Sequence, residues 1–135
     1  MRTARKPIAR GARPDLAAHE HAARVDFDVA VKELAELLGL KLVAYIAGAT
    51  ETRAVRQWAE AERVAREPVP TRLRFALQTA LLIAGHDNAR VAQAWFQGLN
   101  PQLDDRSPAR LLREGELDEI GPLVLSAARA FVSGG

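Results

Sequence analysis

Two proline-containing turns in the carboxyl-terminal third of the chain limit where its helices can lie. The first, Asn100-Pro101, follows an apolar segment containing Trp95. The residue before a proline is disfavoured in the α region, so a helix must end before this turn. The second, Ser107-Pro108, marks the start of a helix. Serine caps a helix amino terminus and proline is tolerated at the first helical position, so the sequence predicts a new helix from Pro108.

The composition favours an all-α protein consisting of one domain, or of two small modules that share a core. Of the 135 residues, 48% are hydrophobic but only seven are aromatic, and the residues that favour strands are sparse. A domain typically holds about 100 to 200 residues, so a chain of this length is too short for a large enzyme. The absence of cysteine excludes disulfides, thiolate zinc sites and cysteine nucleophiles.

Several functional classes find no support in the sequence. No apolar run approaches the ~18 residues of a membrane span, and no secretory signal is evident, so we expect a cytoplasmic protein without a membrane partner. His19 and His21 are two residues apart and cannot share a helix face, which argues against a metal site. Without a phosphate-binding loop or a catalytic triad, we expect neither an enzyme nor a bound cofactor.

Charge is strongly segregated along the chain. Residues 1–13 contain five basic and no acidic side chains, residues 14–40 contain two basic and six acidic, and residues 41–75 contain seven basic and four acidic. This arrangement suits a polyanion that is met by an arm and by one face of a domain. A solvated basic tail and a helix surface rich in Arg-Glu pairs would give the same pattern.

Apolar periodicity predicts a succession of helices after a disordered basic tail at residues 1–24, which lacks such periodicity. The expected helices are 27–38, 41–47, one that begins at Glu51, 71–84, 89–97, one that begins at Pro108 and ends at Gly115, and one that ends near Val132. Pro68 and Pro70 are expected to form a linker. Within the last helix, we favour a single turn and a fresh start at Pro122, because a proline in mid-helix costs ~3 kcal/mol.

The helix at 71–84 has a wider apolar surface than one small core requires. Phe75, Leu82 and Ile83 add to its main apolar side. Two interpretations remain open: an interface with a second copy or a partner, or a central helix surrounded on all sides.

Residues 40–67 have the pattern of a helix-turn-helix. Gly48 opens the turn, Thr50 is expected to cap the second helix, and Val55 and Trp58 place its apolar side on the core. The outward side chains suit a major-groove reader, because arginine can pair with guanine and glutamine with adenine. The predicted DNA-binding residues are Thr50, Thr52, Arg53, Arg56 and Gln57. The alternative is a helical hairpin that only packs against protein.

Residues 40–67 and the segment from Trp95 to Gly115 both resemble the Xre/MbcA/ParS-type antitoxins of bacterial toxin-antitoxin systems. Residues 55–58 match the Val-x-x-Trp of that family's helix-turn-helix, although the turn is one residue longer. Glu60 replaces a common glycine and would let the second helix run on toward Arg66. The residues that match the family's carboxyl-terminal pattern are Trp95, Asn100, Pro101, Leu103, Pro108, Leu111, Leu112 and Gly115.

The resemblance implies an antitoxin with a tail at 1–24, a helix-turn-helix DNA-binding module at 25–67 and a toxin-binding and dimerisation domain at 68–135. The partners that the resemblance implies are a second copy in a homodimer, operator DNA, and a cognate RES-domain toxin that degrades NAD and that the protein neutralises. The residues expected to enter the toxin are Phe131, Val132, Ser133, Gly134 and Gly135. The alternatives are an interaction module without DNA binding and a stand-alone regulator.

Overall fold

The computed structural model describes residues 14–134, and this part of the chain is helical, as predicted. The elements in chain order are α2 (Pro14–Arg24), α3 (Phe27–Leu38), α4 (Leu40–Ala47), α5 (Thr52–Ala59), α6 (Val69–His86), α7 (Ala89–Gln97), the 3-10 helix η1 (Pro101–Leu103), α8 (Pro108–Glu114) and α9 (Leu117–Val132). Within the described range, no helix combines the length and the hydropathy needed to cross a bilayer.

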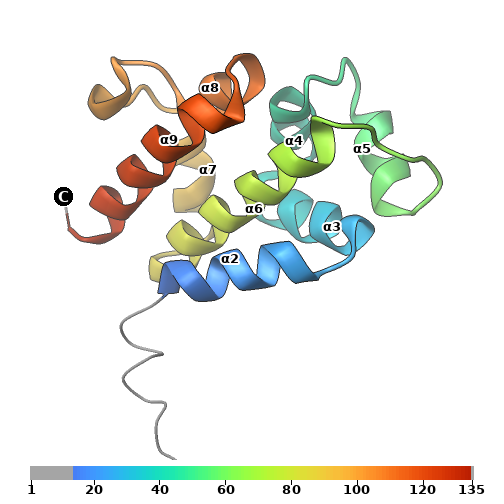
Figure 1. Ribbon diagram of the computed structural model, residues 1–135, viewed down its shortest axis with the longest axis horizontal. Coiled ribbons are helices and arrows are strands. Elements are labelled where there is room, and N and C mark those ends of the chain that lie inside the picture. Colours follow the sequence, from blue (N-terminus) through green and yellow to red (C-terminus); the bar gives the residue numbers. More distant parts are fainter. Residues whose placement is uncertain (1–13, 135) are drawn as a thin grey trace, which may run out of the picture.

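Helix α6 lies at the centre of the molecule. It contacts α2, α3, α4, α7 and α9, and Figure 1 shows it crossing the middle of the view with α2 alongside. Leu82 and Ile83 are buried and Phe75 is half-buried. The central position of α6 is therefore sufficient to explain its wide apolar surface, and a second interface is not needed to account for it.

Side-chain caps set several helix boundaries where the sequence predicted them. The Asn88 side chain accepts a hydrogen bond from the Val91 backbone N–H at 2.9 Å, at the start of α7. Ser107 Oγ accepts one from the Arg110 backbone N–H at 3.1 Å, at the start of α8. Each cap satisfies a backbone donor that has no partner within its helix.

Two glycines allow the chain to reverse direction around α4. Gly39 is the single residue between α3 and α4, and its φ of 89° and ψ of 152° lie in a region that is essentially confined to glycine. Gly48 ends α4 in the left-handed conformation with φ of 82°. Its N–H donates to Tyr45 O and the Ala49 N–H donates to Ala44 O, so that the last carbonyls of α4 are satisfied.

The prediction of a disordered segment is wrong for residues 14–24, which form α2. Ala18 and Ala22 are buried where α2 packs along α6. Small alanines give little apolar periodicity, so this contact with α6 was not visible in the sequence. Alanine's high helix propensity and Asp15 in the first turn are signals that could have indicated a helix. Residues 1–13 of the expected tail lie outside the described residues.

The favoured fresh start at Pro122 is also wrong, because α9 is one helix with Pro122 inside it. Gly121 is buried, and a Cβ placed there would meet Phe75 and Leu117 at 3.6 Å. Val124 is fully buried one turn later. Packing on both sides of Pro122 therefore outweighs the loss of one backbone hydrogen bond in the second turn.

Residues on both sides of Pro68 contribute to a single core. Buried side chains of α3, α4 and α5 form one continuous cluster with those of α6 to α9. Helix α6 starts at Val69, so Pro70 lies in its first turn and the expected linker is correspondingly shorter.

Candidate functional site

Helices α4 and α5 form the predicted pair, joined by residues 48–51. Val55 and Trp58 are buried, as their spacing predicted, and the Trp58 ring lies 6.4 Å from that of Phe27, measured between centroids. The start of α5 differs from the prediction. It begins at Thr52 with Glu51 as the N-cap residue, and no side chain caps it. Thr50 therefore precedes the cap.

The structure brings together three of the five predicted DNA-binding residues. Thr50, Arg53 and Gln57 line a depression of about 580 Å³ between the turn and α5, together with Glu51 and Arg63. The other two, Thr52 and Arg56, lie outside this lining. Arg56 is exposed and Thr52 is half-buried.

Helix α5 ends at Ala59 rather than running on toward Arg66. Ala61 adopts the left-handed conformation, with φ of 59°. The Ala61 N–H donates to Trp58 O at 3.1 Å and the Glu62 N–H donates to Gln57 O at 2.8 Å. This pair of bonds closes the carboxyl end of a helix in the Schellman manner. The turn returns the chain toward α5, where Arg63 Nη1 donates to Gln57 Oε1 at 3.3 Å.

Not all of the basic charge at residues 41–75 faces solvent. Arg72 donates to the carbonyls of Ile46 and Ala47 at the end of α4, at 3.4 and 3.2 Å. Arg74 donates to the carbonyls of Ala22 and Val25 at the end of α2, at 2.9 and 2.7 Å. These two arginines cap helix ends.

Two further long side chains, from α7 and α8, donate hydrogen bonds to backbone carbonyls near the ends of α3 and α4. Gln93 Nε2 donates to Leu37 O at 2.9 Å, and Arg113 Nη1 donates to Tyr45 O at 2.7 Å. The Arg113 guanidinium also lies 4.7 Å from the centre of the Tyr45 ring. Helix α4 is thus bonded to α6 and α8, and the end of α3 is bonded to α7.

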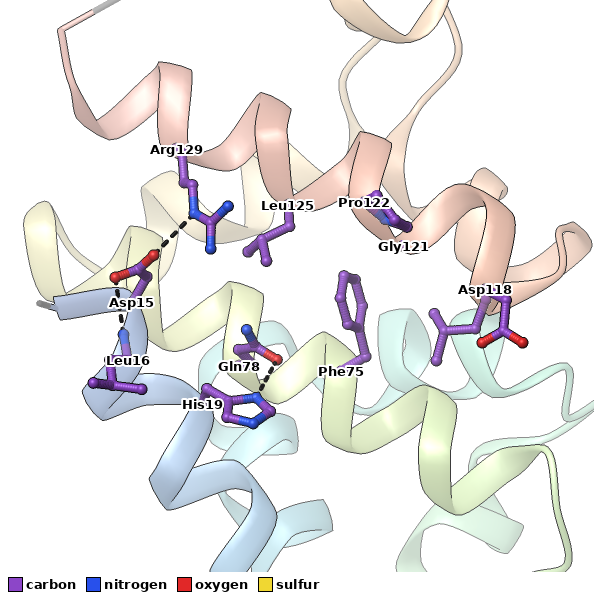
Figure 2. Close-up of a pocket in the computed structure, with 11 residues that line it drawn as sticks. Asp15, Leu16, His19, Phe75, Gln78, Asp118, Gly121, Pro122, Leu125 and Arg129 are labelled. Atoms are coloured by element: carbon purple, nitrogen blue, oxygen red, sulfur yellow. Dashed lines mark hydrogen bonds and ion pairs between the residues drawn. The ribbon is translucent and has the colours of Figure 1, made fainter.

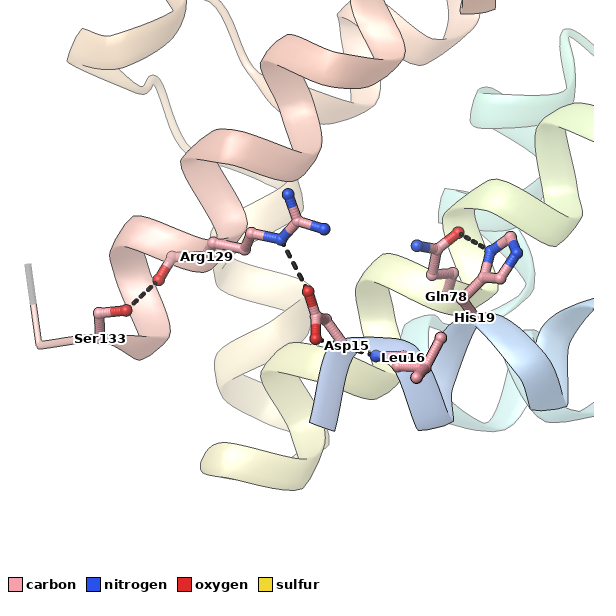
Figure 3. Close-up of polar contacts among 6 residues, drawn as sticks. All are labelled: Asp15, Leu16, His19, Gln78, Arg129 and Ser133. Carbon is pink, nitrogen blue, oxygen red and sulfur yellow. Dashed lines mark hydrogen bonds and ion pairs between the residues drawn. The ribbon is translucent and has the colours of Figure 1, made fainter. Parts of the chain in front are cut away.

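Four of the five predicted toxin-binding residues, 131–134, lie at the carboxyl-terminal end of α9. Phe131 is 37% exposed, Ser133 and Gly134 are exposed, and Val132 is half-buried against the core. Ser133 Oγ donates to Arg129 O at 2.8 Å and extends the last turn of the helix (Figure 3). Gly135 lies outside the described residues.

A surface cavity that the sequence did not predict lies between α2, α6 and α9. It has a volume of about 730 Å³ and includes Leu16, Phe75 and Leu125 in its lining (Figure 2). Arg129 Nε pairs with Asp15 Oδ2 at 2.9 Å across one end, and His19 Nδ1 lies 3.2 Å from Gln78 Oε1 (Figures 2 and 3).

A second cavity, of about 760 Å³, lies on the other side of α2 and includes Val132 and Ser133 in its lining. Two of the predicted toxin-binding residues therefore border a concave surface. Recognising either cavity from the sequence required knowing that α2 is a helix.

The comparisons with known proteins gave one informative similarity. No family model and no curated protein matches the chain. It is similar to a chain in the "Crystal structure of the M.tuberculosis MbcT-MbcA toxin-antitoxin complex", with a TM-score of 0.65 and 27% sequence identity. The alignment covers 82% of this chain and 97% of that chain. This similarity confirms the family resemblance that the helix-turn-helix and the Trp95 to Gly115 motif predicted.

Proposed function

We propose that this MbcA-like chain is the antitoxin of a toxin-antitoxin pair. It binds and neutralises a RES-domain toxin that degrades NAD, and it represses its own operon through α4 and α5. The observation that carries the proposal is its similarity to 97% of the length of a chain from the MbcT-MbcA complex. The NAD chemistry belongs to the toxin, and this chain acts by binding.

The positions of the two candidate surfaces support a protein with two partners. In Figure 1, α4 and α5 lie at one end of the molecule and the carboxyl terminus of α9 lies at the other. A toxin held at the end of α9 would leave the exposed side of α5 accessible to DNA. The two proposed activities are therefore sterically compatible within one chain.

Removing the Phe131 side chain should weaken toxin binding. Phe131 is a partly exposed aromatic near the end of α9, and aromatic anchors that fill a partner's pocket contribute about 2 kcal/mol or more. We expect Phe131→Ala to raise the Kd for the protein encoded by the neighbouring gene about 30-fold or more. Deletion of residues 133–135 should also reduce neutralisation. The measurements are calorimetry on the purified proteins, and growth and cellular NAD after co-expression.

Leu123→Ala is the matched control, since Leu123 is 51% exposed and lies on the same helix. Its Kd should stay close to that of the unaltered chain. An unchanged Kd for both Phe131→Ala and the deletion would exclude the end of α9 as the toxin contact. Stable NAD in cells that are poisoned by the partner would exclude a NAD-degrading toxin.

Exposed arginines of α5 should contribute to operator binding. We expect Arg53→Ala and Arg56→Ala each to weaken binding to the DNA upstream of the gene by about 1 to 3 kcal/mol, because each would remove donors to a base edge. Fluorescence anisotropy with a labelled duplex at fixed salt measures this change.

Arg90→Ala is the control, because Arg90 is exposed on α7, outside the helix-turn-helix. Toxin binding without any operator binding would instead establish a pure interaction module. Operator binding by a chain that binds no toxin would establish a stand-alone regulator.

A further inference from the structure

The contact between Arg63 and Gln57 determines what Gln57 can offer to a ligand. Arg63 Nη1 donates to Gln57 Oε1 at 3.3 Å. An arginine side chain carries donors and no acceptor, so it orients the carboxamide with its oxygen toward Arg63. The amide oxygen therefore faces the guanidinium, which occupies one of its two acceptor positions, while both N–H donors of Gln57 are left for another group.

The backbone places Arg63 where it can make this contact. Ala61 in the left-handed conformation turns the chain, and the Glu62 N–H bonds to the backbone carbonyl of Gln57 itself at 2.8 Å. Arg63 follows directly. Its approach to Gln57 is therefore part of the way in which α5 ends, and it is not a chance meeting of two long surface side chains.

Together with Arg53, this pair presents hydrogen-bond donors. Arg53, Gln57 and Arg63 line the same depression of about 580 Å³ beside the turn. In the major groove, adenine offers one acceptor and one donor, so a glutamine that reads adenine needs both its oxygen and its nitrogen. Guanine offers two acceptors, N7 and O6, and is matched by donors alone.

We propose that the Arg63-oriented Gln57 makes this surface a reader of guanine rather than adenine. The proposal rests on the DNA-binding part of the proposed function and specifies its base preference. Glu51, the one acidic residue in the lining of the depression, is compatible with it. A carboxylate accepts from the cytosine N4 amino group, which lies in the base pair of guanine.

Selection of binding sites from a randomised 20-base-pair duplex library tests the proposal. The full chain, Gln57→Ala, Arg63→Ala and Arg66→Ala are each carried through selection and sequencing. The unaltered chain should enrich guanine at a position whose preference disappears in Gln57→Ala. Arg63→Ala frees the amide oxygen, so the preference for guanine over adenine there should fall about 5-fold or more. Arg66 is exposed and outside the depression, so Arg66→Ala should keep the preference.

The other possible results separate the role of Arg63 from DNA binding itself. Adenine at the Gln57-dependent position, or a guanine preference that is unchanged in Arg63→Ala, overturns the role of Arg63 and leaves DNA binding intact. Enrichment with no Gln57-dependent position does the same. If no sequence is enriched although the protein is folded by circular dichroism, the DNA-binding part of the proposed function fails, and this proposal fails with it.

Discussion

Phe96→Ala should lower the free energy of unfolding by about 3 to 5 kcal/mol. Phe96 is completely buried in α7, and its ring meets that of Trp95 edge-to-face, with 5.2 Å between centroids and an angle of 88°. The substitution removes an entire aromatic side chain from a close-packed core and leaves a cavity. A domain of this size has a total stability of about 5 to 15 kcal/mol, so the loss is a large part of it.

Urea denaturation followed by far-ultraviolet circular dichroism measures this loss as a lower midpoint. Leu99→Ala is the matched control, because Leu99 follows α7 closely in the chain and is 75% exposed. Its stability should stay within about 0.5 kcal/mol of the original. A loss below about 1 kcal/mol for Phe96→Ala would show that this residue does not occupy the core in solution.

Trp58→Ala should also cost about 3 to 5 kcal/mol, and it should destabilise the chain as one unit. Trp58 is 6% exposed and packs α5 against Phe27 of α3. Because the core continues from these helices into α6 to α9, damage at Trp58 should lower the unfolding midpoint of the carboxyl-terminal helices as well. The sequence contains two tryptophans, so in this variant the tryptophan fluorescence comes from Trp95 alone.

The informative comparison is between Trp95 fluorescence and helix content in the Trp58→Ala protein. Coincident transitions at a reduced urea concentration are the expected result. If the Trp95 transition stayed at its original midpoint while part of the helix signal was lost earlier, the helix-turn-helix would unfold independently. Val64→Ala provides the control, since Val64 is 86% exposed in the following loop.

Local chemistry made many of the helix ends predictable. Asn88 and Ser107 are caps whose effect depends on a side chain and a backbone N–H a few residues away. Gly48 is similar, because a left-handed residue ends α4. Such signals lie within one turn of the residue concerned, so a single sequence is enough to recognise them.

Two of the wrong predictions concern elements that contact distant residues. Helix α2 is placed by α6 and by the pair between Asp15 and Arg129, which are 114 residues apart. Helix α9 continues through Pro122 with Gly121 and Val124 buried against the rest of the molecule. In α9 the local preference of Pro122 argued for a break, and tertiary packing overrode it. In α2 the local helix propensity of alanine agreed with the structure, but the contact with α6 gave no apolar periodicity by which to recognise it.

The sequence predicted which side of α5 is buried, but not how its exposed residues are arranged. The helical spacing placed Val55 and Trp58 on the core and Arg53 on the outside, as the structure has them. The contact of Arg63 with Gln57 depends on Ala61 adopting a left-handed conformation, which is unusual for alanine and has no sequence signal. The use of Arg72 to cap α4 was equally invisible in a count of charges.

The packing of α2 along α6 determines how far the protein can be shortened from its amino terminus without loss of the fold. A fragment starting at residue 25, the boundary expected from the sequence, would lack α2, whose Ala18 and Ala22 are buried where it packs along α6. It would also leave Arg74 without the Ala22 carbonyl that it caps. Such a fragment would expose a contiguous apolar strip and be prone to aggregation. Recombinant fragments and protease-resistant cores of this protein should therefore begin at Pro14 or earlier.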